Sequence, residues 1–378
     1  MKKVCIQGLG FVGAVMSLVC ANAINGNYAV IGVEVSTKRG KKITNELNNG
    51  IFPLVAEDPK IDQLFEKSIE KGNFFATTET DAYKVADIII IDINLDVEKE
   101  NLTSGALIDY NVDLSSFKKA IVSIGENCKE DALILVETTV PPGTCENMIL
   151  PILRNCYSIR GIDPDDVKLA HSYERVMPGE NYLDSLINYW RVYSANTDVA
   201  ANECEKFLTD IINVKNFPLK RMSSLNASEA AKILENTYRA VNIAFMEEWG
   251  RFAEDAGVDL YDVIDAIRVR PTHSNIRYPG VGVGGYCLTK DPMFAPAAAK
   301  QIFQIDNLSF PFVTLTKEIN RKLNVDDFGY LLGPILNSGA RLGKSNLSAK
   351  LLISEDKNEI KELSNKLLIT NEKRKIIE

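Results

Sequence analysis

Histidine is nearly absent from this sequence of 378 residues, which contains only His171 and His273. Neither histidine has a neighbour at metal-ligand spacing, so we expect no metal site. The seven cysteines include no CxxC pair and no regular spacing, and their number is odd. This usage favours reduced thiols over a disulfide framework.

Long apolar runs, a leader segment and an excess of basic residues are also missing. The run ADIIIIDI (86–93) is too short to span a bilayer and is typical of a buried strand. The N-terminal MKKVCIQGLGFVG passes directly from lysines to apolar residues and glycines, without a cleavage-type segment. The net charge of −8 argues against nucleic-acid binding. We therefore expect a cytoplasmic protein with no membrane or nucleic-acid partner.

The first half of the chain alternates strand-like and helical patterns. Strand-like segments occur at 3–9, 28–35, 86–93, 132–140 and 167–172. Such alternation predicts βαβ units around a parallel sheet. The turn PPGT (141–144) is expected to lead into another helix, because proline is tolerated near a helix start. We assign residues 1–212 to this α/β domain.

A long helical pattern begins near Leu225 and contains no proline. Ser224 or Asn226 is suited to cap its start and Gly257 to end it. A helix of roughly thirty residues would extend ~45 Å, enough to connect domains or to support a dimer interface. Residues 213–325 are predicted to form a central helical domain.

The last region begins like a further α/β unit. Residues 310–323 and 329–341 have helical patterns, and SAKLLIS (348–354) resembles the first strand of such a unit. The charged segment that follows has no further glycine-rich turn and no second strand-like run. We therefore predict that residues 326–378 are the remnant of a domain.

Gly8, Gly10 and Gly13 have GxGxxG spacing directly after the first strand. In a dinucleotide-binding turn, these glycines permit a tight turn, close approach of a pyrophosphate and close helix–strand packing. Glu34 ends the second strand 21 residues after Gly13. An acid there binds ribose hydroxyls and repels a 2′-phosphate, so we predict NAD and not NADP as the cofactor. The alternative is a glycine-rich turn beside a surface glutamate.

Lys232, Asn236 and Arg239 lie at i, i+4 and i+7 of the long helix and share one face. An amine, an amide and a guanidinium suit an anionic or hydroxyl-rich ligand. The alternative, a solvated face, is weakened by the small and apolar residues around the three.

Together these motifs resemble the UDP-glucose/GDP-mannose dehydrogenase family of nucleotide-sugar 6-dehydrogenases. The resemblance runs from residue 1 to about residue 350. It rests on GLGFVG (8–13), ETTVPPGT (137–144), YERVMPGE (173–180), AAKILENTYRAVNIAFMEE (230–248) and GVGGYCLTKDP (282–292). The segments ENTYRAVNIAF (235–245) and PGVGVGGYC (279–287) are most similar to the UDP-N-acetylhexosamine branch. It implies a Rossmann-like doubly wound N-terminal domain, a central long-helix domain and a shortened C-terminal nucleotide-sugar domain.

The resemblance also implies oxidation of a sugar CH₂OH to a carboxylate with two NAD⁺ per turnover. Cys287 matches the nucleophile that captures the aldehyde and carries the thioester. Lys232 matches the lysine that stabilises oxyanions, and Asn236 matches the amide that shares this task. Asp291 matches the acid that assists hydrolysis. Glu174 matches the glutamate near the reacting carbon.

Further positions follow from the same resemblance. Thr139 matches the threonine near the nicotinamide and the attacking water, and Phe11 and Val12 join the three glycines and Glu34 at the dinucleotide. The sugar-nucleotide positions are Arg175, Val176, Lys232, Asn236, Arg239, His273 and Gly284. The resemblance makes a UDP-sugar the expected substrate and a homodimer the preferred assembly.

Simpler interpretations stay open for several of these residues. Glu174 and Arg175 could form an ordinary surface ion pair. His273 could be an exposed loop residue, and Asp291 could act only in a turn before proline. The six cysteines other than Cys287 are expected to pack as small apolar side chains.

The sequence departs from the family pattern at three places. Tyr173 stands where proline is common, and IIIDINLDVE (89–98) lacks a Pro-Thr-Pro segment and its threonine. No KPxTDDxR-like segment follows the central region. Two rival functions therefore remain: a truncated, catalytically impaired paralogue that binds NAD or a full-length partner, and a single-hydride hydroxyacid-type dehydrogenase, which would not use Cys287.

Overall fold

The computed structural model of the chain describes residues 1–54, 57–98, 111–177, 179–304, 346–354 and 356–377. The chain divides into two compact units, residues 1–304 and residues 305–378.

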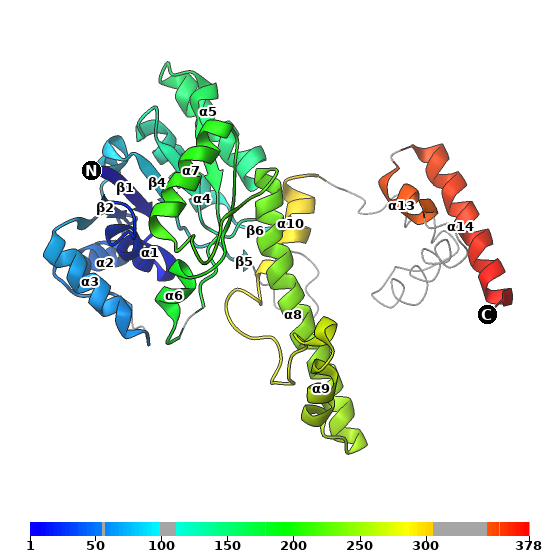
Figure 1. Ribbon diagram of the computed structural model, residues 1–378. Helices are drawn as coiled ribbons and strands as arrows, with labels where there is room; N and C mark the ends of the chain where they lie inside the picture. Colours follow the sequence, from blue (N-terminus) through cyan, green and yellow to red (C-terminus); the bar gives the residue numbers. More distant parts are fainter. Residues whose placement is uncertain (55–56, 99–110, 178, 305–345, 355, 378) are drawn as a thin grey trace. The chain divides into compact units, whose positions relative to one another are not determined.

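The first unit contains an eight-stranded sheet with the order β10-β9-β8-β7-β4-β1-β2-β3 (Figure 1). Its strands are β1 (Lys2–Gln7), β2 (Tyr28–Val33), β3 (Phe74–Thr77), β4 (Ile88–Ile91), β7 (Leu133–Val136), β8 (Lys168–His171), β9 (Val192–Ala195) and β10 (Lys220–Arg221). Neighbouring strands are parallel, except that β8 and β9 are antiparallel. The strand order reverses between β1 and β4, and sheets of this kind bind ligands beyond the carboxyl ends of the strands at such a point.

Helices cover both faces of this sheet (Figure 1). In β4, Ile88 and Ile90 belong to one buried cluster, whereas Ile89 and Ile91 belong to the other, as alternation along a strand requires. Residues of α1 (Phe11–Ala21), α3 (Pro59–Lys71), α6 (Tyr182–Ile187) and α7 (Asp198–Ile211) pack in the first cluster, and residues of α4 (Ser115–Asn127) and α5 (Leu150–Ile159) pack in the second. The predicted Rossmann-like α/β fold is confirmed.

Several shorter elements complete the unit. They are α2 (Lys38–Asn48), the antiparallel pair β5 (Val97–Glu98) and β6 (Asn111–Val112), the 3₁₀ turns η1 (Thr80–Val85), η3 (Pro164–Asp166), η4 (Pro271–His273) and η5 (Asp291–Met293), and the π-helical turn η2 (Cys145–Ile149). The helix expected after PPGT is confirmed, because η2 continues directly into α5.

The long helix α8 (Leu225–Ala256) follows the sheet, as the sequence predicted. The Ser224 side chain caps its start by accepting a hydrogen bond from the Ala227 N–H at 3.1 Å. Gly257, with φ of 68°, ends it in the left-handed conformation that glycine adopts without strain. At 1.5 Å per residue, its 32 residues extend about 48 Å.

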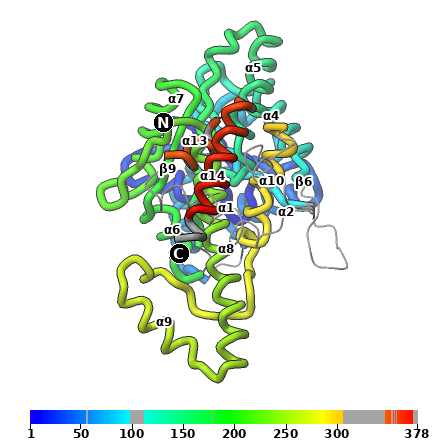
Figure 2. Tube along the Cα trace, turned by 90° about the vertical axis from the view of Figure 1, so that its right-hand side faces the viewer, coloured from blue at the N-terminus to red at the C-terminus, as the bar shows by residue number. Residues whose placement is uncertain are grey.

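The N-terminal and C-terminal halves of α8 have different surroundings. Near its start, Leu225 and Ile233 join the second core cluster together with Phe294 of α10 (Phe294–Gln301). Near its end, Met246 and Ala253 pack with α9 (Leu260–Arg268), which folds back beside α8 (Figures 1 and 2). The segment between α9 and α10 contains Cys287.

The second unit contains two described helices, α13 (Asn346–Ile353) and α14 (Lys357–Ile377). Leu351 of α13 packs with Ile360, Leu363 and Leu367 of α14. The strand predicted at 348–354 is therefore wrong: a short apolar run fits a buried helix as well as a strand, and here a second helix covers it. The helical patterns at 310–323 and 329–341 lie outside the described residues.

Candidate active site

The turn after β1 leaves space at the N-terminus of α1. Gly8 has a φ of 99°, and a Cβ there would lie 2.6 Å from the Asp92 carbonyl oxygen. A Cβ on Gly13 would lie 1.9 Å from the Gly8 carbonyl oxygen. A Cβ on Gly10 would meet no atom within 4 Å. Two glycines are thus required for close packing, and the third borders open space where a pyrophosphate can approach the helix N-terminus.

Glu34 lies directly after β2 and beside this turn. Its carboxylate accepts hydrogen bonds from the backbone N–H groups of Leu9 and Val35, both at 2.9 Å. On the other side, the exposed Phe11 ring stacks on Tyr182, with centroids 4.7 Å apart. Val12 is half-buried. An acid, an open helix N-terminus and an exposed ring around one turn fit a dinucleotide such as NAD.

Lys232 lies against the segment that follows β8. Its ammonium donates to the Glu174 carbonyl oxygen at 2.9 Å and lies 3.7 Å from the Glu174 carboxylate. It also lies 5.3 Å from the centre of the Tyr173 ring. Only 8% of Lys232 is exposed, so the solvated-face interpretation does not hold for this residue.

Asn236, one turn further along α8, contacts the segment after the cysteine. Its Nδ2 donates to Asp291 Oδ2 at 2.7 Å, while Lys290 Nζ donates to Asp291 Oδ1 at 2.6 Å. All three residues are buried. Asp291 does initiate a 3₁₀ turn, but its carboxylate also joins α8 to the loop between α9 and α10 that contains Cys287, which we call the cysteine loop. In this loop the Cys287 carbonyl accepts a hydrogen bond from the Asp291 N–H at 2.9 Å.

Cys287 is the exposed cysteine of the seven, and the other six are buried as expected. Its partial burial is the main cause that raises the pKa of the thiol, and the Asp291 carboxylate adds to this. The ammonium groups of Lys290 and Lys232 act in the opposite direction. The thiol is therefore protonated at rest, beside two cations that favour its thiolate. Cys287 thus shares one electrostatic neighbourhood with Lys232, Asp291 and Glu174.

The cysteine loop is also attached to the sheet. Tyr286 OH accepts a hydrogen bond from Asn94 Nδ2 at 2.6 Å and lies 3.4 Å from the Leu95 carbonyl oxygen. Both partners belong to the segment that follows β4. This contact holds the residue before Cys287 beside the carboxyl edge of the sheet.

The predicted sugar-nucleotide residues are less closely grouped. Val176 packs against the first core cluster, and its N–H donates to the Glu174 carboxylate at 2.5 Å. Arg175 pairs with Glu235 of α8 at 3.4 Å. The ion pair suggested for Glu174 and Arg175 is therefore replaced by pairs that each residue makes with α8.

Three other predicted residues lie at the surface. Arg239 is more than one third exposed and lies 3.9 Å from Glu235. His273 is exposed, and its Nδ1 contacts Thr272 Oγ1 at 2.9 Å, so its described contact is local. Gly284 is exposed in the cysteine loop. Thr139 is half-buried in the turn after β7.

Sequence reasoning did not identify two buried ionic residues of this region. Lys290 is only 4% exposed and its ammonium lies 4.6 Å from the centre of the Phe294 ring. Glu229 is 1% exposed and binds the turn after β7. Lys290 lies within the motif at 282–292, and Glu229 directly precedes the motif at 230–248. Their burial depends on contacts between distant segments, which spacing alone does not show.

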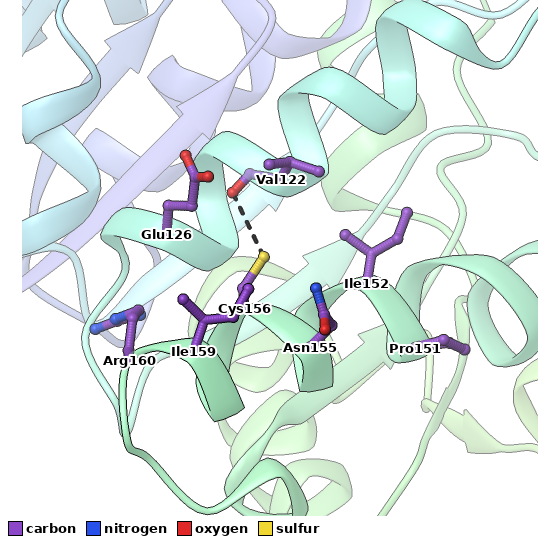
Figure 3. A pocket seen from close by; sticks show the side chains of 8 residues that line it. All are labelled: Val122, Glu126, Pro151, Ile152, Asn155, Cys156, Ile159 and Arg160. Atoms are coloured by element: carbon purple, nitrogen blue, oxygen red, sulfur yellow. Dashed lines mark hydrogen bonds between the residues drawn. The ribbon is translucent and has the colours of Figure 1, made fainter.

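A groove of about 360 Å³ lies between α4 and α5, away from these residues (Figure 3). Apolar side chains such as Val122, Ile152 and Ile159 line it, and Cys156 Sγ lies 3.9 Å from the Val122 carbonyl oxygen. No predicted site residue borders this groove.

No helix among the described residues is long and apolar enough to cross a membrane. No group of three or more histidine, cysteine, aspartate or glutamate side chains in this part of the chain is placed to hold a metal ion.

Family comparisons match most of the chain. Residues 2–210 match the NAD binding domain of the UDP-glucose/GDP-mannose dehydrogenase family, and residues 226–322 match its central domain.

Individual relatives agree with the family match. The chain is 28% identical over 321 residues to a UDP-N-acetyl-D-mannosamine dehydrogenase of Pyrococcus horikoshii, covering 85% of this chain and 68% of the relative. It is 30% identical over 322 residues to the protein of that name from Methanococcus vannielii, covering 85% and 66%. The chain thus spans about two thirds of the length of these relatives.

Solved structures show the same architecture. The UDP-D-ManNAc dehydrogenase structure from Pyrococcus horikoshii has a TM-score of 0.67 at 25% identity, over 90% of this chain and 72% of that one. An NDP-N-acetyl-D-galactosaminuronic acid dehydrogenase from Methanosarcina mazei has a TM-score of 0.67 at 26% identity, over 91% and 70%.

Proposed function

Because this chain belongs to the UDP-glucose/GDP-mannose dehydrogenase family, we propose that it oxidises the C6 alcohol of a nucleotide sugar to the uronic acid. The substrate is a UDP-hexose or a UDP-N-acetylhexosamine. One observation carries the proposal: the contact of Asn236 with Asp291 joins the part of α8 that contains Lys232 and Asn236 to the loop that contains Cys287. Residues 1–212 would serve cofactor binding, and residues 213–325 would serve catalysis.

NAD⁺ supplies the hydride acceptor for each of two oxidations. The turn of Gly8, Gly10 and Gly13 would bind its pyrophosphate, and Glu34 would bind the adenosine ribose. Phe11, Val12 and Thr139 would line the remainder of the cofactor site. Glu34 would also disfavour the 2′-phosphate of NADP by charge repulsion.

Lys232 and Asn236 would bind the oxygen of the reacting carbon. The alcohol becomes an alkoxide as it loses its proton, and an ammonium with 8% exposure stabilises such a charge more strongly than a solvated one. The nearby Glu174 carboxylate can receive the proton. Arg175, Val176, Arg239, His273 and Gly284 would contact the rest of the sugar nucleotide.

Cys287 would separate the two oxidations by covalent catalysis. Its Sγ bonds to the aldehyde carbon and gives a thiohemiacetal. Loss of a second hydride leaves a thioester on Cys287. Attack by water then releases the carboxylate and regenerates the thiol, with Asp291 and Lys232 assisting hydrolysis. Overall, the alcohol, water and two NAD⁺ give the carboxylate, two NADH and three protons.

The named relatives indicate which substrate to test first. Both curated relatives carry the name UDP-N-acetyl-D-mannosamine dehydrogenase. A UDP-N-acetylhexosamine is therefore the first choice, with UDP-glucose as the second.

The exposed face of α8 supports a homodimer. It presents large apolar side chains three or four residues apart: Leu234, Tyr238, Val241, Phe245, Trp249 and Phe252. We call these six residues the apolar stripe. Single exposed apolar residues are ordinary, whereas a continuous row along a helix is typical of an interface. A second copy of the chain, placed isologously, would cover it.

NADH counting tests the proposed function. Purified protein is incubated with excess NAD⁺ and a limiting UDP-sugar, as wild type and as Cys287→Ser, with Cys156→Ser as the control at a cysteine outside the site. We expect two NADH per sugar from wild type and from the control, and no uronic acid from Cys287→Ser.

The other outcomes identify the rivals. One NADH per sugar with Cys287 dispensable would indicate a single-hydride dehydrogenase. Binding of NAD⁺ without turnover of any nucleotide sugar would contradict the proposal and favour an impaired paralogue.

A further inference from the structure

Glu229 has a contact that the catalytic roles above do not use. It lies in the second turn of α8, three residues before Lys232, and only 1% of it is exposed. Its two carboxylate oxygens accept hydrogen bonds from the backbone N–H groups of Gly143 and Cys145, at 2.6 and 2.8 Å.

Those two N–H groups belong to the turn that follows β7 and starts η2. The first N–H groups of a helix have no partner within the helix, and a side chain just before the helix commonly satisfies them. Here the acceptor comes from a different element, 84 residues away from Cys145. Glu229 therefore joins α8 to this turn.

The turn lies near the residues predicted to bind the cofactor. Thr138 donates through both its N–H and its hydroxyl to the Ile91 carbonyl oxygen at the end of β4, at 3.1 and 2.9 Å. Asp92 follows Ile91 directly after β4, and Gly8 packs against the Asp92 backbone. Thr139 follows Thr138 in the same turn. A shift of this turn would thus move Thr139 relative to the other residues predicted to bind the cofactor.

A buried carboxylate at position 229 is better suited to positioning α8 against the turn than to stabilising the fold. Burial raises its pKa to about 7, although the hydrogen bonds from Cys145 and Gly143 act in the opposite direction. A buried carboxylate carries a desolvation cost that an apolar side chain of similar size avoids. Its two short hydrogen bonds, in contrast, fix direction and distance in a way that apolar packing does not.

We propose that Glu229 is a positioning residue that fixes the start of α8, and with it Lys232, against the turn that contains Thr139. Ser228, its neighbour, bonds to His171 of β8 and Ser194 of β9. Glu229 adds the attachment to the end of β7. The two catalytic segments then keep one relative position, and a displacement of about 1 Å can slow a reaction ~100-fold.

The variant Glu229→Gln tests the proposal, because it keeps the size but replaces one acceptor oxygen by a donor NH₂. The matched control is Asp58→Asn. Asp58 is also 1% exposed and accepts two backbone N–H groups, from Lys60 at 3.0 Å and Leu183 at 2.9 Å, but it joins α3 to α6. Both variants are expected to lower the melting temperature.

We expect Glu229→Gln to lower the single-turnover rate of NADH formation at least 10-fold, with less than a twofold change in the sugar KM. Asp58→Asn should leave both values within twofold of wild type. A Glu229→Gln protein that loses thermal stability but transfers hydride at the wild-type rate would overturn the proposal, since Glu229 would then be structural only.

This kinetic test rests on the proposed function, so NAD⁺ titration provides an independent one. If wild type oxidises no nucleotide sugar, the proposed function fails, and Glu229 is judged by the dissociation constant for NAD⁺. A rise of at least threefold in Glu229→Gln, without a rise in Asp58→Asn, supports the proposal. An NAD⁺ affinity equal to wild type contradicts it.

Discussion

Asp291 supplies the negative charge that compensates the buried ammonium of Lys290. Its two oxygens accept hydrogen bonds from Lys290 and Asn236, and none of the three side chains is appreciably exposed. Burying an ion pair need not stabilise a protein, but removing one partner leaves the other charge buried without compensation.

Replacing Asp291 by Asn should therefore lower the free energy of unfolding by about 3 kcal/mol, because the Lys290 ammonium loses its anion. Urea denaturation measures this loss. The double variant Lys290→Met, Asp291→Asn should recover most of the stability, because it leaves no buried charge without a partner.

The exposed pair of Lys84 and Asp81 is the control for this charge effect. Asp81→Asn should change the free energy of unfolding by less than about 1 kcal/mol, as is usual for exposed pairs. Equal losses in Asp81→Asn and Asp291→Asn would show that burial of the pair has no energetic consequence.

His171 makes the stability of the folded protein depend on pH. Burial, with a further effect of the Lys232 ammonium, lowers its pKa from 6.5 to about 3. Its Nδ1 lies 2.7 Å from Ser228 Oγ. Below pH 6.5 the unfolded chain binds a proton at His171 that the folded protein does not bind. The contribution of His171 to stability is therefore complete above pH 6.5 and is lost as the pH falls toward 3.

The predicted loss is about 1.4 kcal/mol per pH unit. Between pH 7 and pH 5, His171 should account for about 2 kcal/mol of the fall in unfolding free energy. His171→Asn should remove this contribution. Urea denaturation of wild type and variant at pH 7 and at pH 5 measures the fall in unfolding free energy of each protein. A wild-type and a variant protein with the same pH dependence would contradict the lowered pKa of His171.

At the scale of single residues, local spacing predicted which side chains share a helix face but not how they are buried. Lys232, Asn236 and Arg239 were placed on one face of α8 from their spacing, yet Lys232 and Asn236 are buried whereas Arg239 is more than one third exposed. Lys290 and Glu229 were missed, because nothing in the neighbouring residues distinguishes a buried ionic side chain from an exposed one.

Among the elements, the cysteine loop depends on a contact with the segment after β4. Tyr286→Phe should speed amide hydrogen exchange of residues 285–291, since it removes the hydroxyl that binds Asn94. Asn94→Ala should have a similar effect, and the double variant should add little to either, because both changes remove the same hydrogen bond.

Tyr278→Phe is the matched control, since the Tyr278 hydroxyl donates to Asp265 of α9 at 2.5 Å and not to the sheet. Its exchange at 285–291 should equal wild type. Additive effects of Tyr286→Phe and Asn94→Ala would mean that the loop is held by other contacts.

The elements themselves were predicted unequally well. The helix α8 was recognisable because Ser224 and Gly257 mark its ends and no proline interrupts it. The strand expected at 348–354 is a helix, since its apolar run is covered by α14 and not by a neighbouring strand. Strand β9 was missed: it has only four residues, and its neighbour Arg191 is buried in an ion pair with Glu137.

For the molecule as a whole, assembly through the apolar stripe can be tested directly. Phe245→Glu should convert a dimer into a monomer in light scattering coupled to size exclusion, because a charge on the stripe would be buried against the second copy. Phe75→Glu, at an equally exposed phenylalanine on the edge strand β3, should leave the mass unchanged. A monomeric wild type would contradict the homodimer.

Because six of the seven thiols are buried, the protein provides a single addressable attachment point without any change to its sequence. A maleimide dye should react at Cys287 alone, and its fluorescence would then follow the site as ligands enter. The same exposure has a cost for the protein. An oxidant needs to reach only one sulfur atom to stop any chemistry that depends on Cys287.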